Sequence, residues 1–214
     1  MMHAPRFDRA HRAAGAPLRR LSSRLGRLIR AREGTFAVET ALALPTMVAF
    51  YLGATELANL VNTKHKMEMV SRVVADLAGR ATTMNVADAR GVLAAAKAVM
   101  APFTGTGLKV VVSSVTVTAT KNANGEVVSA TGAVDWSCAN DGGGLAKKTP
   151  IDVPAAYRTA QSFIWATVDM PYTPLFGSSV IQMVTGQASA KLAEAVAWPV
   201  RDVDQVLWSG GACS

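Results

Sequence analysis

One stretch of this 214-residue sequence limits the possible folds more than any other. From Glu33 to Thr63 the chain contains no lysine or arginine, and the window from Thr35 to Val61 consists mainly of Ala, Leu, Val, Phe, Tyr and Met. About 20 such residues in a helix are enough to cross a bilayer. The window therefore predicts a transmembrane helix, with a buried helix of a soluble protein as the alternative.

The basic residues are concentrated in front of this window. Residues 1–34, the leader, contain nine arginines and two acidic residues, whereas the remaining 180 residues contain 13 basic and 13 acidic side chains, so the net charge of +7 lies entirely in the leader. A nucleic-acid-binding domain would carry its basic surface on the folded part of the chain, so we expect no nucleic-acid partner. Because basic flanks stay in the cytoplasm, the N-terminus is predicted to face in and the rest of the chain out.

Two targeting signals compete with this interpretation. A secretory signal peptide would end in a small-residue cleavage site, and none closes the apolar run. A mitochondrial presequence would also be rich in arginine and poor in acids, but here the apolar window follows immediately.

The segment REGTFAVETALALP places Gly34 five residues before Glu39, in front of an apolar run that Pro45 interrupts, and YLGATELANL follows. These residues resemble the prepilin class, and specifically the TadE-like pilus assembly proteins of the tight-adherence (Tad/Flp) secretion system; the pattern does not separate TadE-like from TadF-like proteins. The resemblance covers residues 32–60. The later segments MPYTPLF and WPVRDV also resemble the family layout, although the second departs from the family's usual Arg-Pro-Arg ending.

The resemblance implies that a prepilin peptidase cuts the chain between Gly34 and Thr35 and removes the leader. A glycine leaves the backbone open to close approach by a protease. Major type IV pilins usually begin with Phe after the cut, whereas here Phe36 comes second. The resemblance also implies that Glu39 pairs with the N-terminal amine of a neighbouring subunit, which would offset its desolvation in an apolar environment.

Two further helix residues lead to expectations. Pro45 removes one backbone hydrogen bond and is predicted to kink the helix. Glu56, at the outer end of the span, is expected to be solvated or to lie at the membrane interface.

Beyond the span, apolar residues from Met67 to Leu77 recur at helical spacing and predict an amphipathic extension of the helix. A second helix is expected between Asn85, as its cap, and Pro102. Alternation from Val115, a turn at NANG and the run EVVSATGAVDW predict two antiparallel strands. A strand is expected over 162–172, and 187–200 fits either a strand or a helix. The glycine-rich segment ANDGGGLAKKTPIDVP is interpreted as a flexible surface loop with solvated lysines.

The predicted fold is therefore α+β, with a long N-terminal transmembrane helix followed by a small extracytoplasmic domain that contains an antiparallel sheet. We expect the cytoplasmic leader at 1–34, the helix with its extension at 35–84 and the outer domain at 85–214.

The cysteine and histidine content limits the chemistry. Cys138 and Cys213 are the only cysteines, both beyond the span, and an even pair in an extracytoplasmic compartment predicts a disulfide. Beyond the leader His65 is the only histidine, so the sequence predicts no catalytic residues, no metal site and no cofactor.

The sequence thus predicts a non-enzymatic, minor pilin-like assembly protein that functions in Tad/Flp pilus biogenesis and adhesion. Its expected location is the inner membrane, as a single-pass protein with a periplasmic or extracellular domain, with incorporation in the pilus left open. The expected partners are the prepilin peptidase, other pilin-like subunits, Tad inner-membrane assembly proteins and the membrane. The alternatives are an uncleaved, membrane-anchored binding or scaffold protein of the envelope, and an extracytoplasmic hydrolase.

Overall fold

The structure is a computed structural model that describes residues 33–103, 105–176, 178, 182–183, 186, 189–211 and 213. The chain divides into two compact units, Met1–Ala54 and Thr55–Ser214. Each unit is described separately below, and the leader, apart from its last two residues, lies outside the described residues.

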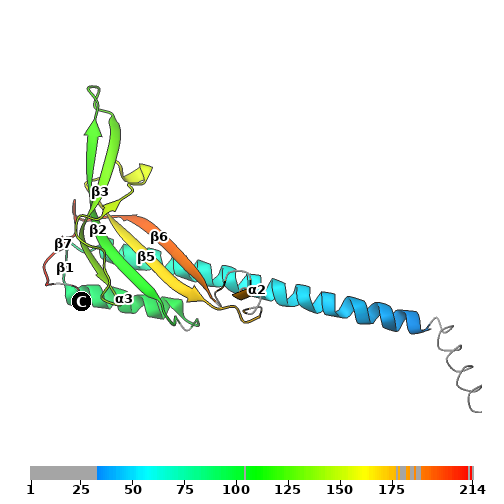
Figure 1. The fold of residues 1–214 in the computed structure, drawn as a ribbon. Helices are drawn as coiled ribbons and strands as arrows, with labels where there is room; N and C mark the ends of the chain where they lie inside the picture. Colours follow the sequence, from blue (N-terminus) through cyan, green and yellow to red (C-terminus); the bar gives the residue numbers. More distant parts are fainter. Residues whose placement is uncertain are drawn as a thin grey trace, which may run out of the picture. The chain divides into compact units, whose positions relative to one another are not determined.

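The N-terminal helix is continuous along the chain. Helix α2 (Glu33–Gly79) continues through Pro45 without a break (Figure 1). It ends five residues before the predicted boundary at residue 84, at a glycine that packs very closely. A Cβ on Gly79 would lie only 2.7 Å from the carbonyl oxygen of Pro199, so only glycine fits there without a shift of backbone. The kink at Pro45 stays a prediction.

In the unit Thr55–Ser214, helix α2 contributes a narrow apolar stripe to the core. Its members recur at spacings of three and one along the helix, as one face of an α-helix requires. They are Met67, Val70, Ser71, Val74, Ala75 and Ala78, all fully buried. Leu77, which we had placed on this face, is 41% exposed, because the small Ala75 and Ala78 occupy the close contact instead.

Helix α3, Val86–Met100, matches the sequence prediction. The side-chain oxygen of Asn85 accepts hydrogen bonds from the amides of Ala87 and Asp88 at 2.8 and 3.0 Å, and the Asp88 carboxylate accepts the Asn85 amide at 3.2 Å. This capping box pairs the first orphan amides of the helix. The helix ends just before Pro102, as expected.

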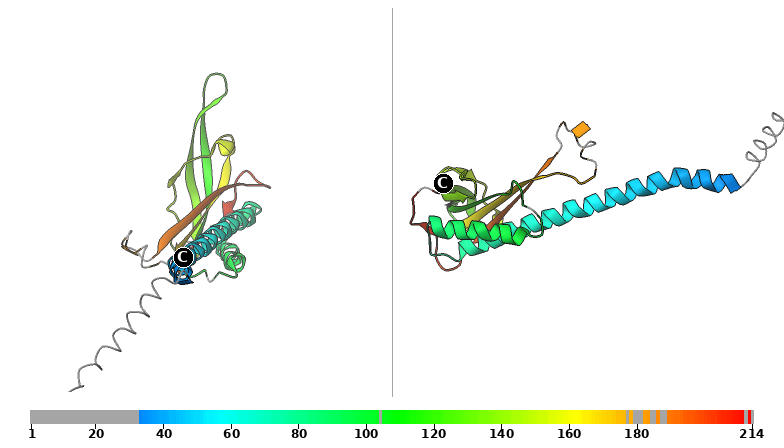
Figure 2. Two further views of the ribbon diagram at one scale, coloured as in Figure 1. Left: turned by 90° about the vertical axis from the view of Figure 1, so that its right-hand side faces the viewer. Right: turned by 90° about the horizontal axis from the view of Figure 1, so that it is seen from below.

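A five-stranded sheet lies against these helices. Its order is β4-β3-β2-β5-β6, every neighbouring pair is antiparallel, and a two-stranded parallel pair, β1-β7, is added at the side. The strands are β1 (Thr83–Met84), β2 (Lys109–Lys121), β3 (Val127–Ala139), β4 (Pro150–Ile151), β5 (Ser162–Tyr172), β6 (Ala190–Pro199) and β7 (Leu207–Trp208). Figures 1 and 2 show α3 and the adjoining part of α2 on one face of the sheet, and buried residues of both helices and of β2, β3 and β5 form the main core. The predicted α+β class is confirmed.

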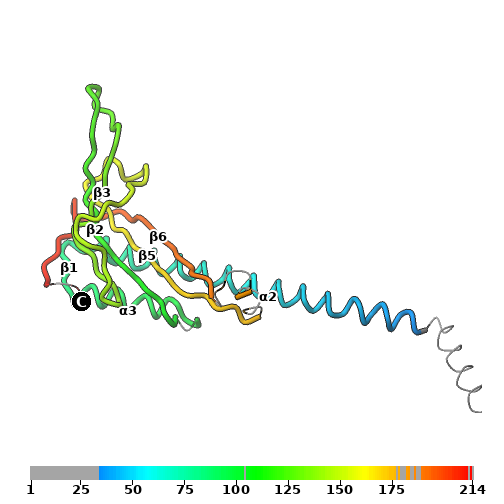
Figure 3. Tube along the Cα trace, in the orientation of Figure 1, coloured from blue at the N-terminus to red at the C-terminus, as the bar shows by residue number. Residues whose placement is uncertain are grey.

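Strands β2 and β3 form a hairpin that extends past the rest of the sheet (Figure 3). Strand β5 pairs with β2 only as far as Thr116, whereas β2 pairs with β3 along its length to Lys121. Gly125 has a φ of 84° in the connecting turn, which explains the glycine of the NANG signal.

The segment 139–154 lies at the surface with both lysines exposed, as predicted, but its second half is tied to the sheet. Strand β4 pairs with β3, and the buried Val153 joins Val115, Val134 and Phe163 in a second apolar cluster. Phe163 and Ile164 are consecutive in β5 but belong to different clusters, so this second cluster lies on the opposite face of the sheet. Lys147 is 70% exposed but pairs with Asp135 at 3.0 Å.

The end of the chain is fastened to β3 in two ways. A disulfide joins Cys138 to Cys213, with Cα atoms 5.3 Å apart. The indole of Trp136 donates a hydrogen bond to the carbonyl of Val206 at 2.8 Å and packs against Trp208 with ring centroids 5.1 Å apart. These contacts hold the last segment against the helix-covered face of the sheet.

Candidate functional site

The helical segment 34–54, here called the apolar segment, is exposed along most of its length in the described part of the chain. Every described side chain from Gly34 to Tyr51 is exposed, including Phe36 at 75%, Leu42 at 73% and Phe50 at 76%. Helix α2 is long and apolar enough to cross a membrane, and none of its most apolar window is buried. A helix buried in a soluble core would show the opposite burial, so the exposure of this segment is consistent with a single-pass membrane anchor.

The predicted processing and pairing residues all lie on this exposed segment. Gly34 and Thr35 are in the first turns of α2, and a Cβ on Gly34 would meet no atom within 4 Å. Glu39 is exposed, and the described residues offer its carboxylate no hydrogen-bond or ion-pair partner. Any partner of Glu39 must therefore come from outside the described chain.

Glu56, by contrast, is held by three donors and is therefore not simply solvated, whereas its expected position at the membrane interface stays a prediction. The Tyr172 hydroxyl donates a short hydrogen bond to its Oε1, and the backbone amides of Leu175 and Phe176 donate to its Oε2 at 3.1 and 3.2 Å. Burial, the hydrogen bond to Glu56 and the charge of Glu56 together raise the pKa of Tyr172 to about 12. We call this arrangement the Glu56 clamp.

A second acidic residue of α2 is held in the same manner at the other end of the sheet contact. Asp76 pairs with Arg80 at 2.6 Å and with Arg201 at 2.6 Å, and the indole of Trp198 donates to it at 3.2 Å. Desolvation would raise the pKa of Asp76, but the hydrogen bonds from Arg80 and Trp198 and the charges of both arginines outweigh it and lower the pKa. We call this arrangement the Asp76 clamp.

The two clamps together set the register of helix on sheet. Glu56 and Asp76 are separated by 20 residues, or about 30 Å of helix. Their partners lie at opposite ends of the β5-β6 pair, where Tyr172 is opposite Ala190 and Phe163 is opposite Pro199. A slide of the helix by one turn would break both clamps at once, so they specify one alignment.

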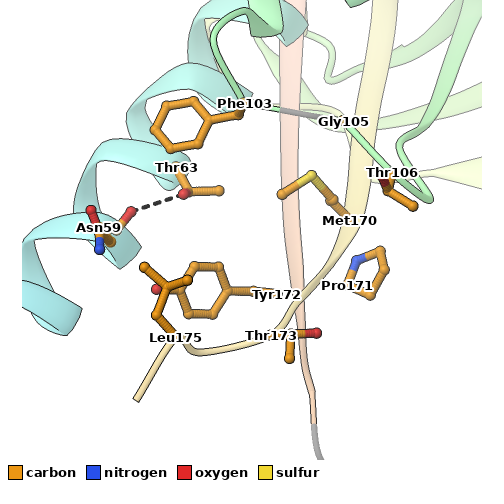
Figure 4. A pocket seen from close by; sticks show the side chains of 10 residues that line it. All are labelled: Asn59, Thr63, Phe103, Gly105, Thr106, Met170, Pro171, Tyr172, Thr173 and Leu175. Carbon is orange, nitrogen blue, oxygen red and sulfur yellow. Dashed lines mark hydrogen bonds between the residues drawn. The ribbon is translucent and has the colours of Figure 1, made fainter. Parts of the chain in front are cut away.

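A pocket lies beside the Glu56 clamp (Figure 4). It has a volume of about 390 Å³, and its walls come from α2, from the segment after α3 and from the end of β5. Thr63 is nearly fully buried in this wall, and its hydroxyl is satisfied by donating to the carbonyl of Asn59 at 2.8 Å. The lining residues are mostly apolar or uncharged: Asn59, Thr63, Phe103, Gly105, Thr106, Met170, Pro171, Tyr172, Thr173 and Leu175.

The sequence alone could not have identified the clamps. Tyr172 and Glu56 are 116 positions apart, and Arg201 and Asp76 are 125 apart, so no local spacing links them. The one available signal was the family-like character of MPYTPLF and WPVRDV, which contain Tyr172, Trp198 and Arg201. In the structure both segments hold acids of the N-terminal helix, and their resemblance to the family layout stays a prediction.

Within the described residues, the fold and these contacts define a class of protein: one helix apolar enough to cross a membrane, and a small α+β domain that includes the C-terminal part of that helix, held by the two clamps. Within that class, residues 34–76 match the model of a family described as TadE-like protein, which confirms the resemblance over this segment and supports a Tad pilus-associated protein. No curated protein and no solved structure matches the chain. The matched segment begins at Gly34 and ends at Asp76, so it contains Glu39 and both clamp acids.

Proposed function

We propose that this chain is a minor pilin-like assembly protein of a Tad/Flp pilus, processed after Gly34 by a prepilin peptidase. The observation that carries the proposal is the fully exposed apolar segment that starts at Gly34 within the TadE-like match. From Gly34 to Tyr51 such a segment can leave lipid for a bundle of like helices and keep its side chains free for contact with them. This step is what assembly of a pilin-like subunit requires.

Glu39 is the residue that makes such assembly selective. Cleavage between Gly34 and Thr35 would create an α-amino group, and an amine from a neighbouring subunit can compensate a carboxylate in an apolar environment. An unpaired carboxylate is costly there, whereas a paired one is much less so. Since Glu39 has no partner among the described residues, the neighbour's Thr35 amine can take that place.

The proposal also covers location and partners. The basic leader places the N-terminus in the cytoplasm, and the Cys138–Cys213 disulfide fits a domain outside it, where disulfides persist. The partners are then the prepilin peptidase, other pilin-like subunits and the Tad inner-membrane assembly proteins. We infer a structural and adhesive role without catalysis. Whether the subunit enters the pilus or stays in the inner membrane follows from where the processed form accumulates.

Processing is tested by the intact mass and N-terminal sequence of the protein isolated from membranes. The wild-type chain should begin at Thr35, and Gly34→Leu should retain the leader. Gly53→Leu is the matched control, because Gly53 lies in the same helix and, like Gly34, has no atom within 4 Å of an added Cβ. That control should be cleaved normally.

Two results would contradict the proposal. A wild-type chain that keeps its leader in cells with an active Tad system would leave an uncleaved, anchored binding or scaffold protein as the explanation. Loss of cleavage in both glycine variants would show that the helix, and not the Gly34 site, had been disturbed. If processing holds, Glu39→Gln should still be cleaved but should fail to assemble with its partners.

A further inference from the structure

The turn that holds Glu56 carries two large apolar side chains on its surface. This turn, Tyr172–Phe176, follows directly from β5, and Leu175 is 73% exposed and Phe176 49% exposed. The sequence contains no charged residue from Met170 to Ala190. An exposed apolar pair in such surroundings indicates a contact that the described residues do not supply.

The backbone of this turn is prepared for a poorly hydrated environment. The amides of Leu175 and Phe176 donate to Glu56. Pro174, which precedes them in the chain, is buried and has no N–H to satisfy. Backbone groups without partners prevent a segment from entering a bilayer, because lipid offers them no hydrogen bonds. Here the carboxylate of Glu56 satisfies the amides, and the amides and Tyr172 in turn compensate its charge.

The position of Glu56 along the chain places this turn near the membrane boundary. The apolar segment 34–54 has 21 residues, so as a helix it is about 31 Å long, close to the hydrocarbon thickness of about 30 Å. Glu56 is the second residue after this segment. Tyrosine is enriched at the membrane–water boundary, and Tyr172 is bonded directly to Glu56.

We propose that the Tyr172–Phe176 turn is a second membrane contact, in which Leu175 and Phe176 insert into the outer boundary of the same bilayer that holds the apolar segment. The partner is lipid, recognised by uncharged apolar side chains on a hydrogen-bonded turn. The inference rests on the membrane anchorage included in the proposed function. It adds that the outer domain is seated on the membrane surface and does not move freely above it, until assembly removes the helix from lipid.

The test uses the full chain in vesicles of phosphatidylcholine and phosphatidylglycerol. Because Cys138 and Cys213 are joined, Phe176→Cys supplies a single thiol for a polarity-sensitive fluorophore, and nitroxide-labelled lipids serve as the quencher. Leu175→Cys repeats the measurement from the neighbouring side chain in case one substitution disturbs folding. Phe50→Cys, in the apolar segment, is the control for a label in lipid. Val128→Cys, on the β2-β3 hairpin where Val128 is 60% exposed, is the control for a label away from lipid.

We expect lipid nitroxides to quench the label at residues 175, 176 and 50 several-fold more strongly than at residue 128. Quenching at residue 50, with residues 175 and 176 no different from residue 128, would overturn this inference and leave membrane anchorage intact. Absence of quenching at residue 50 as well would overturn the anchorage, and the inference with it. A label at residue 176 that is shielded from aqueous iodide but not quenched by lipid would show that another protein surface, such as a second copy, covers the turn.

Discussion

The Glu56 clamp makes a quantitative prediction about what holds the outer domain onto its helix. Glu56→Gln keeps the shape of the side chain but replaces one carboxylate oxygen with an NH₂ group that cannot accept. Three donors, the Tyr172 hydroxyl and the amides of Leu175 and Phe176, then compete for a single remaining oxygen. With that oxygen toward the two amides, the NH₂ group faces the Tyr172 hydroxyl, which loses its charged acceptor and can only accept a weaker neutral hydrogen bond.

The expected size of the effect follows from the number of bonds and their exposure. A hydrogen bond to a charged group contributes about 1.5–3 kcal/mol when it is buried, and water competes for a half-buried carboxylate, so the lower end applies. We therefore expect Glu56→Gln to reduce the free energy of unfolding of the outer domain by about 2 kcal/mol, and Tyr172→Phe by about 1 kcal/mol. Because the two residues are in contact, the double variant should show a coupling of about 1 kcal/mol.

The assay is urea unfolding of the full chain in detergent micelles, followed by tryptophan fluorescence. All four tryptophans lie beyond residue 130, so their emission reports the unfolding of the outer domain and not of the helix in the micelle. The control is Glu68→Gln, since Glu68 is another partly exposed acid of α2, paired with Arg72 at 2.6 Å. A surface pair of this kind contributes about 0.5 kcal/mol or less.

Two outcomes would refute this reasoning. If Glu56→Gln costs no more than Glu68→Gln, the clamp does not stabilise the domain and its hydrogen bonds only exchange with water. If Glu56→Gln and Tyr172→Phe are additive, the two side chains do not interact in solution.

Three further predictions follow from the same contacts. Because the pKa of Asp76 is lowered in the folded protein, its contribution to stability should be present above pH 3.8, the ordinary pKa, and be lost as the pH falls below that value. Urea titrations of Asp76→Asn should lack this part of the acid dependence. In alkaline difference spectra Tyr172 should ionise at a pH near 12 in the wild type and closer to pH 10.0 in Glu56→Gln. The stability that Tyr172 contributes should persist below pH 10.0 and be lost as the pH rises through about 12. Gly79→Ala should destabilise by about 1–3 kcal/mol through its clash with a β6 carbonyl, whereas Gly91→Ala, in an open position of α3, should stabilise by about 0.5–1 kcal/mol in thermal unfolding.

The elements with strong local signals could be predicted from the sequence. Strand β5 has the predicted bounds, 162–172, and α3 begins after its predicted cap at Asn85. Capping and alternation are properties of a few neighbouring residues, so one sequence is enough to show them. The pattern of residues 187–200 fitted a helix as well as a strand. The structure has strand β6 there because it pairs with β5, and no local pattern encodes that pairing.

Elsewhere the sequence signal failed for physical reasons. Strand β2 begins at Lys109, six residues before the alternation that we used to recognise it. Its first part, residues 110–115, is buried on both faces, because the helices cover one face and the second apolar cluster the other, so alternation is absent there. The two clamps could not be predicted for a different reason. When a carboxylate and its donors are far apart in the sequence, the sequence does not distinguish that carboxylate from an ordinary surface acid.

The disulfide between Cys138 and Cys213 changes how the protein responds to proteolysis. The bond closes a covalent loop that contains β4, β5, β6 and β7. A single cut anywhere between residues 138 and 213 therefore releases no fragment, because both pieces remain linked through sulfur. Such a nicked chain would migrate at full mass without reductant and separate into two only when reduced. The outer domain can thus suffer one break and still stay attached to its membrane helix.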